Sequence, residues 1–222
     1  MMKPGVKLAV FDCDGTLIDS QVNILRAMRQ CFDRQGLTPP ADHDVRRVVG
    51  LSLVESMQML LPDADPALHV RLAQDYKGAF QRLRADASLD PEPLYAGIAD
   101  LLDSLRDDGW LLGVATGKSD RGLALALAHH GLSGHFVTLQ TADRHPSKPH
   151  PAMLMAALAG AGVAAQDAVV IGDTVFDIAM GGHAGVRAIG VEWGYHEAAE
   201  LLDAGAVGVA VDARQLRRLI DG

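Results

Sequence analysis

The chain has 222 residues, of which 49% are hydrophobic and 22% are charged. This composition is typical of a folded globular protein of one or two domains and argues against extensive disorder. The formal net charge of −8 makes DNA, RNA and anionic membrane surfaces poor partners, because each of them would need a basic face on the protein.

The cysteine content and the N-terminus bear on cellular location. The chain has two cysteines, Cys13 and Cys31, whose spacing fits neither a disulfide framework nor a zinc site. No signal-peptide apolar region follows the first residues, and the alanine-rich stretch 153–165 is shorter than the roughly 20 residues that span a bilayer. We therefore expect a cytoplasmic protein that does not enter a membrane.

The first predicted element is a buried strand that ends in two aspartates. Residues 8–11 form an apolar run, and Asp-Cys-Asp-Gly-Thr follows at 12–16. In an extended segment Asp12 and Asp14 point the same way, and ligands of open α/β sheets bind at such strand ends. Two carboxylates this close need a shared proton or a metal cation.

A long helical block follows this strand. Residues 21–35, with Ser20 as N-cap, and the segments 45–49, 53–61 and 66–84 carry apolar residues at helical spacing. No strand pattern interrupts them, so we expect a small helical bundle. The stretch 85–93 contains two prolines and no periodicity, which is typical of a linker.

Strands and helices then alternate to the end of the chain. We predict strands at 110–115, 136–139, 168–171 and 188–191, helices near 98–105, 122–130, 151–161 and 175–184, and two short final elements. This alternation predicts a parallel sheet covered by helices on both faces. The helical block is then an inserted domain at 20–90, and the α/β core comprises 1–19 and 91–222.

Polar residues that could bind an anion or a cation follow three further strands or loops. Thr116 and Gly117 offer a hydroxyl and backbone N–H groups at the start of a helix, and Lys148 sits on a loop stiffened by proline. Asp173 and Asp177 lie four residues apart at another helix start, where they share one face. Each signal alone is weak, but one crevice at the sheet edge would collect all of them.

These motifs resemble those of a known enzyme superfamily. Asp12-x-Asp14-Gly15-Thr16 and Gly172-Asp173-x-x-x-Asp177 are similar to the signatures of the haloacid dehalogenase-like (HAD) hydrolases, in the branch with a helical cap after the first motif. Within it, phosphoglycolate phosphatase-like enzymes are most similar. The resemblance implies a Rossmann-like parallel-sheet core with an inserted all-helical cap, and hydrolysis of a small phosphorylated metabolite.

The resemblance also implies residue roles. Asp12 would be the nucleophile that forms an aspartyl-phosphate, and Asp14 the general acid and base. Thr116, Gly117 and Lys148 would hold the phosphoryl oxygens.

The metal expected from the resemblance is Mg²⁺. Asp12, the backbone carbonyl of Asp14 and Asp173 would bind it, and Asp177 would support them from outside the ligand set. Magnesium prefers oxygen ligands, which agrees with a site made of aspartates.

Substrate specificity would depend on the cap. Gly50, Leu51 and Ser52 form a candidate cap loop that meets the substrate, although a solvated surface explains them equally well. Lys118 lies beside Thr116 and would reach either substrate or solvent.

Other functions share parts of this pattern. A phosphomutase resembling β-phosphoglucomutase would use the same aspartyl-phosphate, and a pyrophosphatase is a further, less favoured alternative. A dehalogenase is disfavoured because those enzymes lack the second aspartate, here Asp14. A response-regulator receiver also gathers Asp, Thr and Lys around Mg²⁺, but it has no helical insertion after its first strand. The substrate and the oligomeric state stay open.

Overall fold

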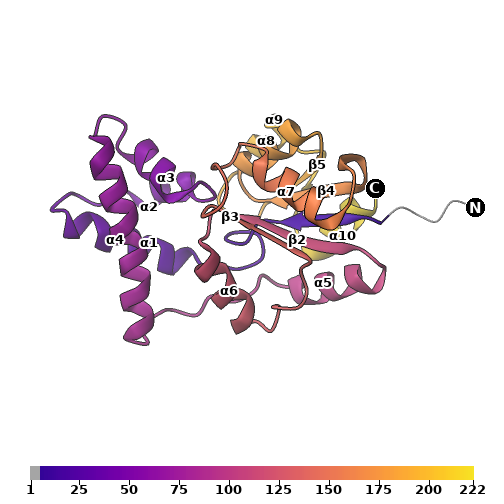
Figure 1. Ribbon diagram of the computed structural model, residues 1–222, viewed down its shortest axis with the longest axis horizontal. Coiled ribbons are helices and arrows are strands. Elements are labelled where there is room, and N and C mark those ends of the chain that lie inside the picture. Colours follow the sequence, from indigo (N-terminus) through magenta and orange to yellow (C-terminus); the bar gives the residue numbers. More distant parts are fainter. Residues whose placement is uncertain (1–5) are drawn as a thin grey trace, which may run out of the picture.

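The computed structural model describes residues 6–222, and its core is a parallel sheet of six strands (Figure 1). The strand order is β3-β2-β1-β4-β5-β6, and every neighbouring pair is parallel. The strands are β1 (Leu8–Phe11), β2 (Leu111–Thr116), β3 (Thr138–Thr141), β4 (Ala168–Gly172), β5 (Arg187–Val191) and β6 (Val209–Ala210). This is the order of doubly wound α/β folds, in which the crevice lies where the order reverses, here beside β1 and β4. The predicted α/β fold class is confirmed.

Helices cover both faces of the sheet because its central strands are apolar on both sides. In β1, Ala9 and Phe11 belong to one apolar cluster, and Leu8 and Val10 belong to the other. The first cluster includes side chains of α5 (Ile98–Asp107), α6 (Asp120–His129) and α10 (Ala213–Asp221). The second includes side chains of α7 (Ala152–Ala161), α8 (Val175–Ala184) and α9 (Ala198–Asp203). A short 3₁₀ turn, Ala165–Asp167, leads into β4.

The helical block between β1 and α5 has its own apolar cluster. Its helices are α1 (Gln21–Arg34), α2 (Asp42–Val48), α3 (Leu53–Leu60) and α4 (Pro66–Ala85). Met28, Phe32, Met57 and Leu72 are buried together between them. Figure 1 shows this block, in indigo and purple, beside the sheet on the side away from the C-terminus. We call residues 20–90 the cap, after the predicted limits.

Two sequence predictions about the sheet domain were wrong. The third strand begins at Thr138 rather than Phe136, because Thr138 is the first residue that pairs in register, opposite Gly113 of β2. Phe136 packs half-buried against the core from the preceding loop, so its apolar character reflected packing rather than strand pairing. The chain also ends in three elements, α9, β6 and α10, instead of two.

The longest helix, α4, has 20 residues. Arg71, Asp75 and Lys77 interrupt its apolar residues. Among residues 6–222, no helix combines the length and the hydropathy that crossing a bilayer requires.

Candidate active site

The two motif aspartates lie in the turn that follows β1. The backbone N–H of Asp12 donates to the carbonyl of Ile171 at 2.9 Å, which continues the pairing of β1 with β4. The N–H of Leu17 then donates to the carbonyl of Cys13 at 2.9 Å and closes the turn. Cys13 is buried in the core, as predicted, which leaves Asp12 buried and Asp14 half-buried on the other side of the chain.

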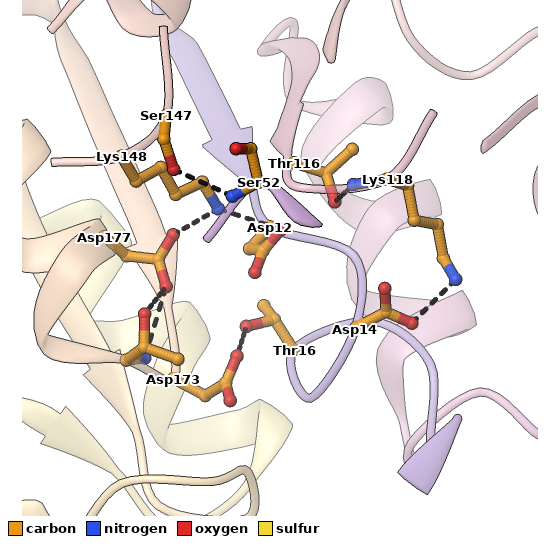
Figure 2. A network of polar contacts seen from close by, with 11 residues as sticks. Asp12, Asp14, Thr16, Ser52, Thr116, Lys118, Ser147, Lys148, Asp173 and Asp177 are labelled. Carbon is orange, nitrogen blue, oxygen red and sulfur yellow. Dashed lines mark hydrogen bonds and ion pairs between the residues drawn. The ribbon is translucent and has the colours of Figure 1, made fainter. Parts of the chain in front are cut away.

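Figure 2 shows that the predicted site residues surround this turn. Lys148, Asp173 and Asp177 lie on one side of it, and Thr116 and Lys118 lie on the other. They come from the ends of β2 and β4, from the start of α8 and from the loop before α7. The parallel sheet therefore collects side chains that are more than 150 positions apart in sequence, as between Thr16 and Asp173.

Lys148 is a fully buried cation between two aspartates. Its Nζ lies 3.0 Å from Oδ1 of Asp12 and 2.6 Å from Oδ1 of Asp177. Burial alone would lower the pKa of Lys148, but the charges of Asp12 and Asp177 outweigh this effect and raise it. Lys148 therefore stays protonated at neutral pH. Removing one partner of such a buried pair typically costs about 3–5 kcal/mol, because the other charge is left uncompensated.

Asp177 is held by partners on both of its oxygens. Oδ1 accepts the hydrogen bond from Lys148, and Oδ2 accepts bonds from the backbone N–H of Thr174 at 3.2 Å and from its hydroxyl at 2.7 Å. Thr174 is the residue before α8, so the start of this helix orients the carboxylate. Asp177 in turn fixes the Lys148 ammonium near Asp12.

Asp173 is also oriented by its neighbours. Its Oδ1 accepts a hydrogen bond from the hydroxyl of Thr16 at 2.7 Å, and its Oδ2 accepts one from the backbone N–H of Tyr195 at 3.0 Å. Burial raises the pKa of Asp173 well above its usual range, and the nearby charges of Asp12 and Asp177 raise it further. Two hydrogen bonds favour the ionised form but do not offset the burial.

Asp12 differs from these two aspartates because its oxygens have fewer polar partners. Apart from the Lys148 ammonium, 3.0 Å from Oδ1, neither oxygen has a polar partner in the part of the chain that the structure describes. Burial raises the pKa of Asp12 to about 7. Lys148 opposes this shift, and the charges of Asp177 and Asp14 add to it.

The three buried carboxylates fit a divalent metal ion. Asp12, Asp173 and Asp177 each offer an oxygen, and these oxygens lie within 4.8 Å of one another. Oδ2 of Asp12 is the clearest sign, because it has no partner among the described residues, and three buried carboxylates share the single Lys148 ammonium, so a further cation would compensate their charge. An all-oxygen donor set suits a hard ion such as Mg²⁺.

Asp14 is held away from this acidic cluster by two donors. The Nζ of Lys118 lies 2.8 Å from its Oδ1, and the hydroxyl of Ser20 donates to the same oxygen. The predicted N-cap position of Ser20 before α1 is confirmed, but its side chain makes no capping hydrogen bond. Its hydroxyl orients Asp14 instead. The backbone N–H of Lys118 donates to Oγ1 of Thr116 at 3.3 Å, which orders the loop after β2.

The candidate cap loop 50–52 lies against the core loops of the site. The backbone N–H of Ser52 donates to Oγ of Ser147 at 2.8 Å (Figure 2). A Cβ at Gly117 would lie 2.5 Å from the carbonyl oxygen of Leu51 and 2.9 Å from that of Gly50, so only glycine lets the cap come this close. These three cap residues are therefore beside the site: Gly50 and Leu51 lie against Gly117, and Ser52 is bonded to Ser147.

Several residues of the site were missed by sequence reasoning. Thr16 belongs to the first motif, and its hydroxyl could have been assigned to the acidic cluster from that position. Tyr195 and Ser147 act through a backbone N–H and a short hydroxyl in loops, where no spacing marks them. The contact of Ser20 with Asp14 needed the turn geometry.

Comparison with known proteins identifies the family to which the motifs after β1 and β4 belong. Residues 9–191 match the family model described as haloacid dehalogenase-like hydrolase. The chain is 31% identical to "Probable phosphatase IndB" of Dickeya dadantii over 90% of this chain and 86% of that protein. It is 32% identical to "Phosphoglycolate phosphatase" of Chromobacterium violaceum over 88% of this chain and 89% of that protein.

A solved structure has the same fold along nearly its whole length. The crystal structure of a "predicted phosphatase" from Clostridium acetobutylicum superposes with a TM-score of 0.87 at 25% identity, over 98% of this chain and 99% of that one. The fold, the motifs after β1 and β4 and the family match all agree. The chain therefore belongs to the haloacid dehalogenase-like hydrolase family.

Proposed function

We propose that this protein is a Mg²⁺-dependent phosphomonoesterase that works through an aspartyl-phosphate on Asp12. The observation that carries the proposal is the state of the Asp12 carboxylate. It is buried at the end of β1, its Oδ1 lies 3.0 Å from the Lys148 ammonium, and its Oδ2 has no partner among the described residues. Such a carboxylate is positioned to attack a phosphorus atom once the repulsion between the two anions is cancelled.

Asp12, Asp173 and the backbone carbonyl of Asp14 would hold the metal. When bound, Mg²⁺ neutralises charge on the phosphoryl oxygens and on the attacking carboxylate. Asp177 would support these ligands from outside the set, by holding the Lys148 ammonium beside Asp12.

The chain's own residues would divide the hydrolysis into two displacements. An oxygen of Asp12 attacks phosphorus, the ester bond breaks, and the departing oxygen takes a proton from Asp14. Asp14 then removes a proton from a water molecule, whose oxygen attacks the same phosphorus and releases Asp12. Lys148, Thr116 and the backbone N–H groups at Gly117 would hold the phosphoryl oxygens through both steps.

Lys118 and Ser20 would orient Asp14 for both proton transfers, since both bind its Oδ1. Gly50, Leu51 and Ser52 would close the site against bulk water, because they already contact Gly117 and Ser147. A small phosphorylated metabolite is the proposed substrate class, with no nucleic acid or membrane partner, in the cytoplasm. The names of the relatives make 2-phosphoglycolate the reference compound.

The test is phosphate release from 2-phosphoglycolate, sugar phosphates, pyrophosphate and nucleoside monophosphates, with and without Mg²⁺. The wild type should release phosphate only with Mg²⁺, and Asp12→Asn should lose roughly 10⁴-fold in kcat because the nucleophile is absent. Asp19→Asn is the matched control, because Asp19 is an exposed aspartate at the end of the same turn. It should keep normal activity.

Three outcomes would contradict the proposal. A hexose product that retains its phosphoryl group would favour a phosphomutase, and release from pyrophosphate alone would favour a pyrophosphatase. Full activity of Asp12→Asn would exclude Asp12 as the nucleophile.

A further inference from the structure

The cavity at the candidate active site is much larger than a phosphate group requires. Its volume is about 970 Å³, and it extends from Asp12, Asp14 and Thr116 to residues of all four cap helices and of α6. Cavities of roughly 300–1,000 Å³ hold drug-sized ligands. In the proposed function the phosphoryl group would occupy only the end near Asp12, so most of the volume would be available to the group that leaves with the ester oxygen.

Most of the cap side of this cavity is apolar, and the polar side chains that the cap helices add are Ser56, Lys77, Gln81 and Arg84. The lining side chains from the cap helices include Ile24, Met28, Val45, Val48, Tyr76 and Phe80. The rings of Tyr76 and Phe80 are 5.3 Å apart between centroids and tilted by 55°. Leu125 and Ala126 of α6 contribute apolar groups from the core side. Such walls favour an apolar or aromatic leaving group, because its burial removes apolar surface from water.

The charges around the cavity disfavour a small anionic leaving group. The Lys118 ammonium is already paired with Asp14 at 2.8 Å, and Asp90 and Glu92 add carboxylates to the lining. Lys77 pairs with Asp143 at 3.3 Å.

The two other lining cations that the structure describes are arginines. Arg121 is exposed and Arg84 is half-buried, so both are in contact with solvent. The described lining therefore offers an anionic leaving group no lysine or arginine that is both buried and unpaired.

We propose that the preferred substrate is a phosphomonoester of a bulky, mainly apolar alcohol or phenol, whose body packs against Tyr76 and Phe80. This inference rests on the proposed phosphomonoesterase function and specifies its substrate class. In the reaction the phosphorus–oxygen ester bond breaks, water supplies the new oxygen of inorganic phosphate, and the released alcohol or phenol oxygen gains a proton.

The first experiment compares kcat/KM for phenyl phosphate, 1-naphthyl phosphate and 2-phosphoglycolate in the presence of Mg²⁺. The two aryl esters have leaving groups of similar acidity, so a difference between them reports on binding. We expect kcat/KM for 1-naphthyl phosphate to exceed the other two values by about tenfold or more, as extra apolar contacts in a pocket typically give.

Variants locate the preference in this cavity. Phe80→Ala removes a half-buried ring from the cavity wall and should reduce the ratio of naphthyl to phenyl kcat/KM by about fivefold or more, mainly through KM. Phe136→Ala is the matched control, because Phe136 is a half-buried ring that packs on the sheet core and does not line the cavity. Leu125→Trp narrows the cavity at a side chain that is 38% exposed, so the variant should still fold. Its kcat/KM should fall more for 1-naphthyl phosphate than for phenyl phosphate.

The outcomes separate this inference from the function on which it rests. Efficient hydrolysis of 2-phosphoglycolate, with no advantage of naphthyl over phenyl phosphate, would overturn the substrate class and keep the phosphomonoesterase. Equal effects of Phe80→Ala and Phe136→Ala on the naphthyl-to-phenyl ratio would also overturn it. No phosphate release from any ester would overturn the proposed function itself.

Discussion

Gly15 occupies the turn between the motif aspartates and Thr16 with a φ of +83°, where residues with a Cβ are strained. A Cβ here would also collide with the carboxylate of Asp173 and would lie 2.6 Å from the ring of Tyr195. The glycine therefore lets the first motif approach the residue that follows β4. Backbone conformation and close packing both exclude a side chain at this position.

Gly15→Ala should destabilise the protein by more than the conformational strain alone. Gly36 has a similar φ of +69°, and a Cβ there would meet nothing within 4 Å, so Gly36→Ala measures that strain, about 1–2 kcal/mol. We expect a larger loss in the free energy of unfolding for Gly15→Ala, measured by urea denaturation, because Asp173 and Tyr195 must also move. Equal losses for the two variants would show that the close approach is unimportant.

At the scale of elements, an ion pair joins the cap to the core. Arg47 of α2 donates to Oε2 of Glu200 in α9 at 2.6 Å, and both side chains are about one-third exposed. The hydrogen bond from Arg47 lowers the pKa of Glu200 from its ordinary value of 4.5 to about 2. The two helices belong to different parts of the chain, so this pair contributes to holding the cap over the site. Its exposure limits the contribution to about 1 kcal/mol or less.

The stability due to this pair should depend on pH. The folded pKa of Glu200 lies below its unfolded value, so the contribution is complete above about pH 4.5 and is lost as the pH falls toward about 2. Urea denaturation at about pH 6 and about pH 3 should therefore show a smaller stability difference between wild type and Glu200→Gln at the lower pH. Glu192→Gln, at an exposed glutamate of the loop after β5, should show no such convergence. If the stability difference between wild type and Glu200→Gln were larger at about pH 3 than at about pH 6, the pair would not be the source of this pH dependence.

At the scale of the whole molecule, the parallel sheet brings the ends of β1 and β4 to the same edge and the cap covers that edge. The buried carboxylates of Asp12, Asp173 and Asp177 then repel one another, with Lys148 as the close cation among the described residues. An ion that binds only the folded protein stabilises it in proportion to the logarithm of its concentration. The proposed metal site would therefore also contribute to global stability.

Adding Mg²⁺ to the chelator-treated protein should raise its melting temperature. At 100 times the dissociation constant, binding contributes about 2.7 kcal/mol, which corresponds to a shift of roughly 5–10 °C for a chain of this size. Asp173→Asn should strongly reduce the shift, because it removes a proposed ligand charge, whereas Asp19→Asn should retain it. Differential scanning fluorimetry with and without Mg²⁺ measures this shift for the wild type and for each variant. An undiminished shift in Asp173→Asn would place the ion elsewhere.

Much of the fold could be predicted from the sequence because its signals are local. The apolar runs at 8–11 and 168–171 are buried strands, and the helical spacing at 21–35 and 66–84 corresponds to α1 and α4. The strand at 136–139 was misplaced because packing of Phe136 resembles a strand pattern. The candidate site residues were predicted from their positions at strand ends, and the structure brings them together, although their chemical roles stay predictions.

The sequence by itself determined the fold class, the family and the residues that gather around Asp12, because strand-end motifs depend on neighbours a few positions apart. The tertiary structure alone decided which oxygens are already bonded, as in Asp177 and Asp173, and which are not, as in Asp12. It also decided the size and apolar lining of the cavity. These properties arise from contacts between segments far apart in the chain, such as the cap helices and α6, and no local pattern encodes the distance between two such surfaces.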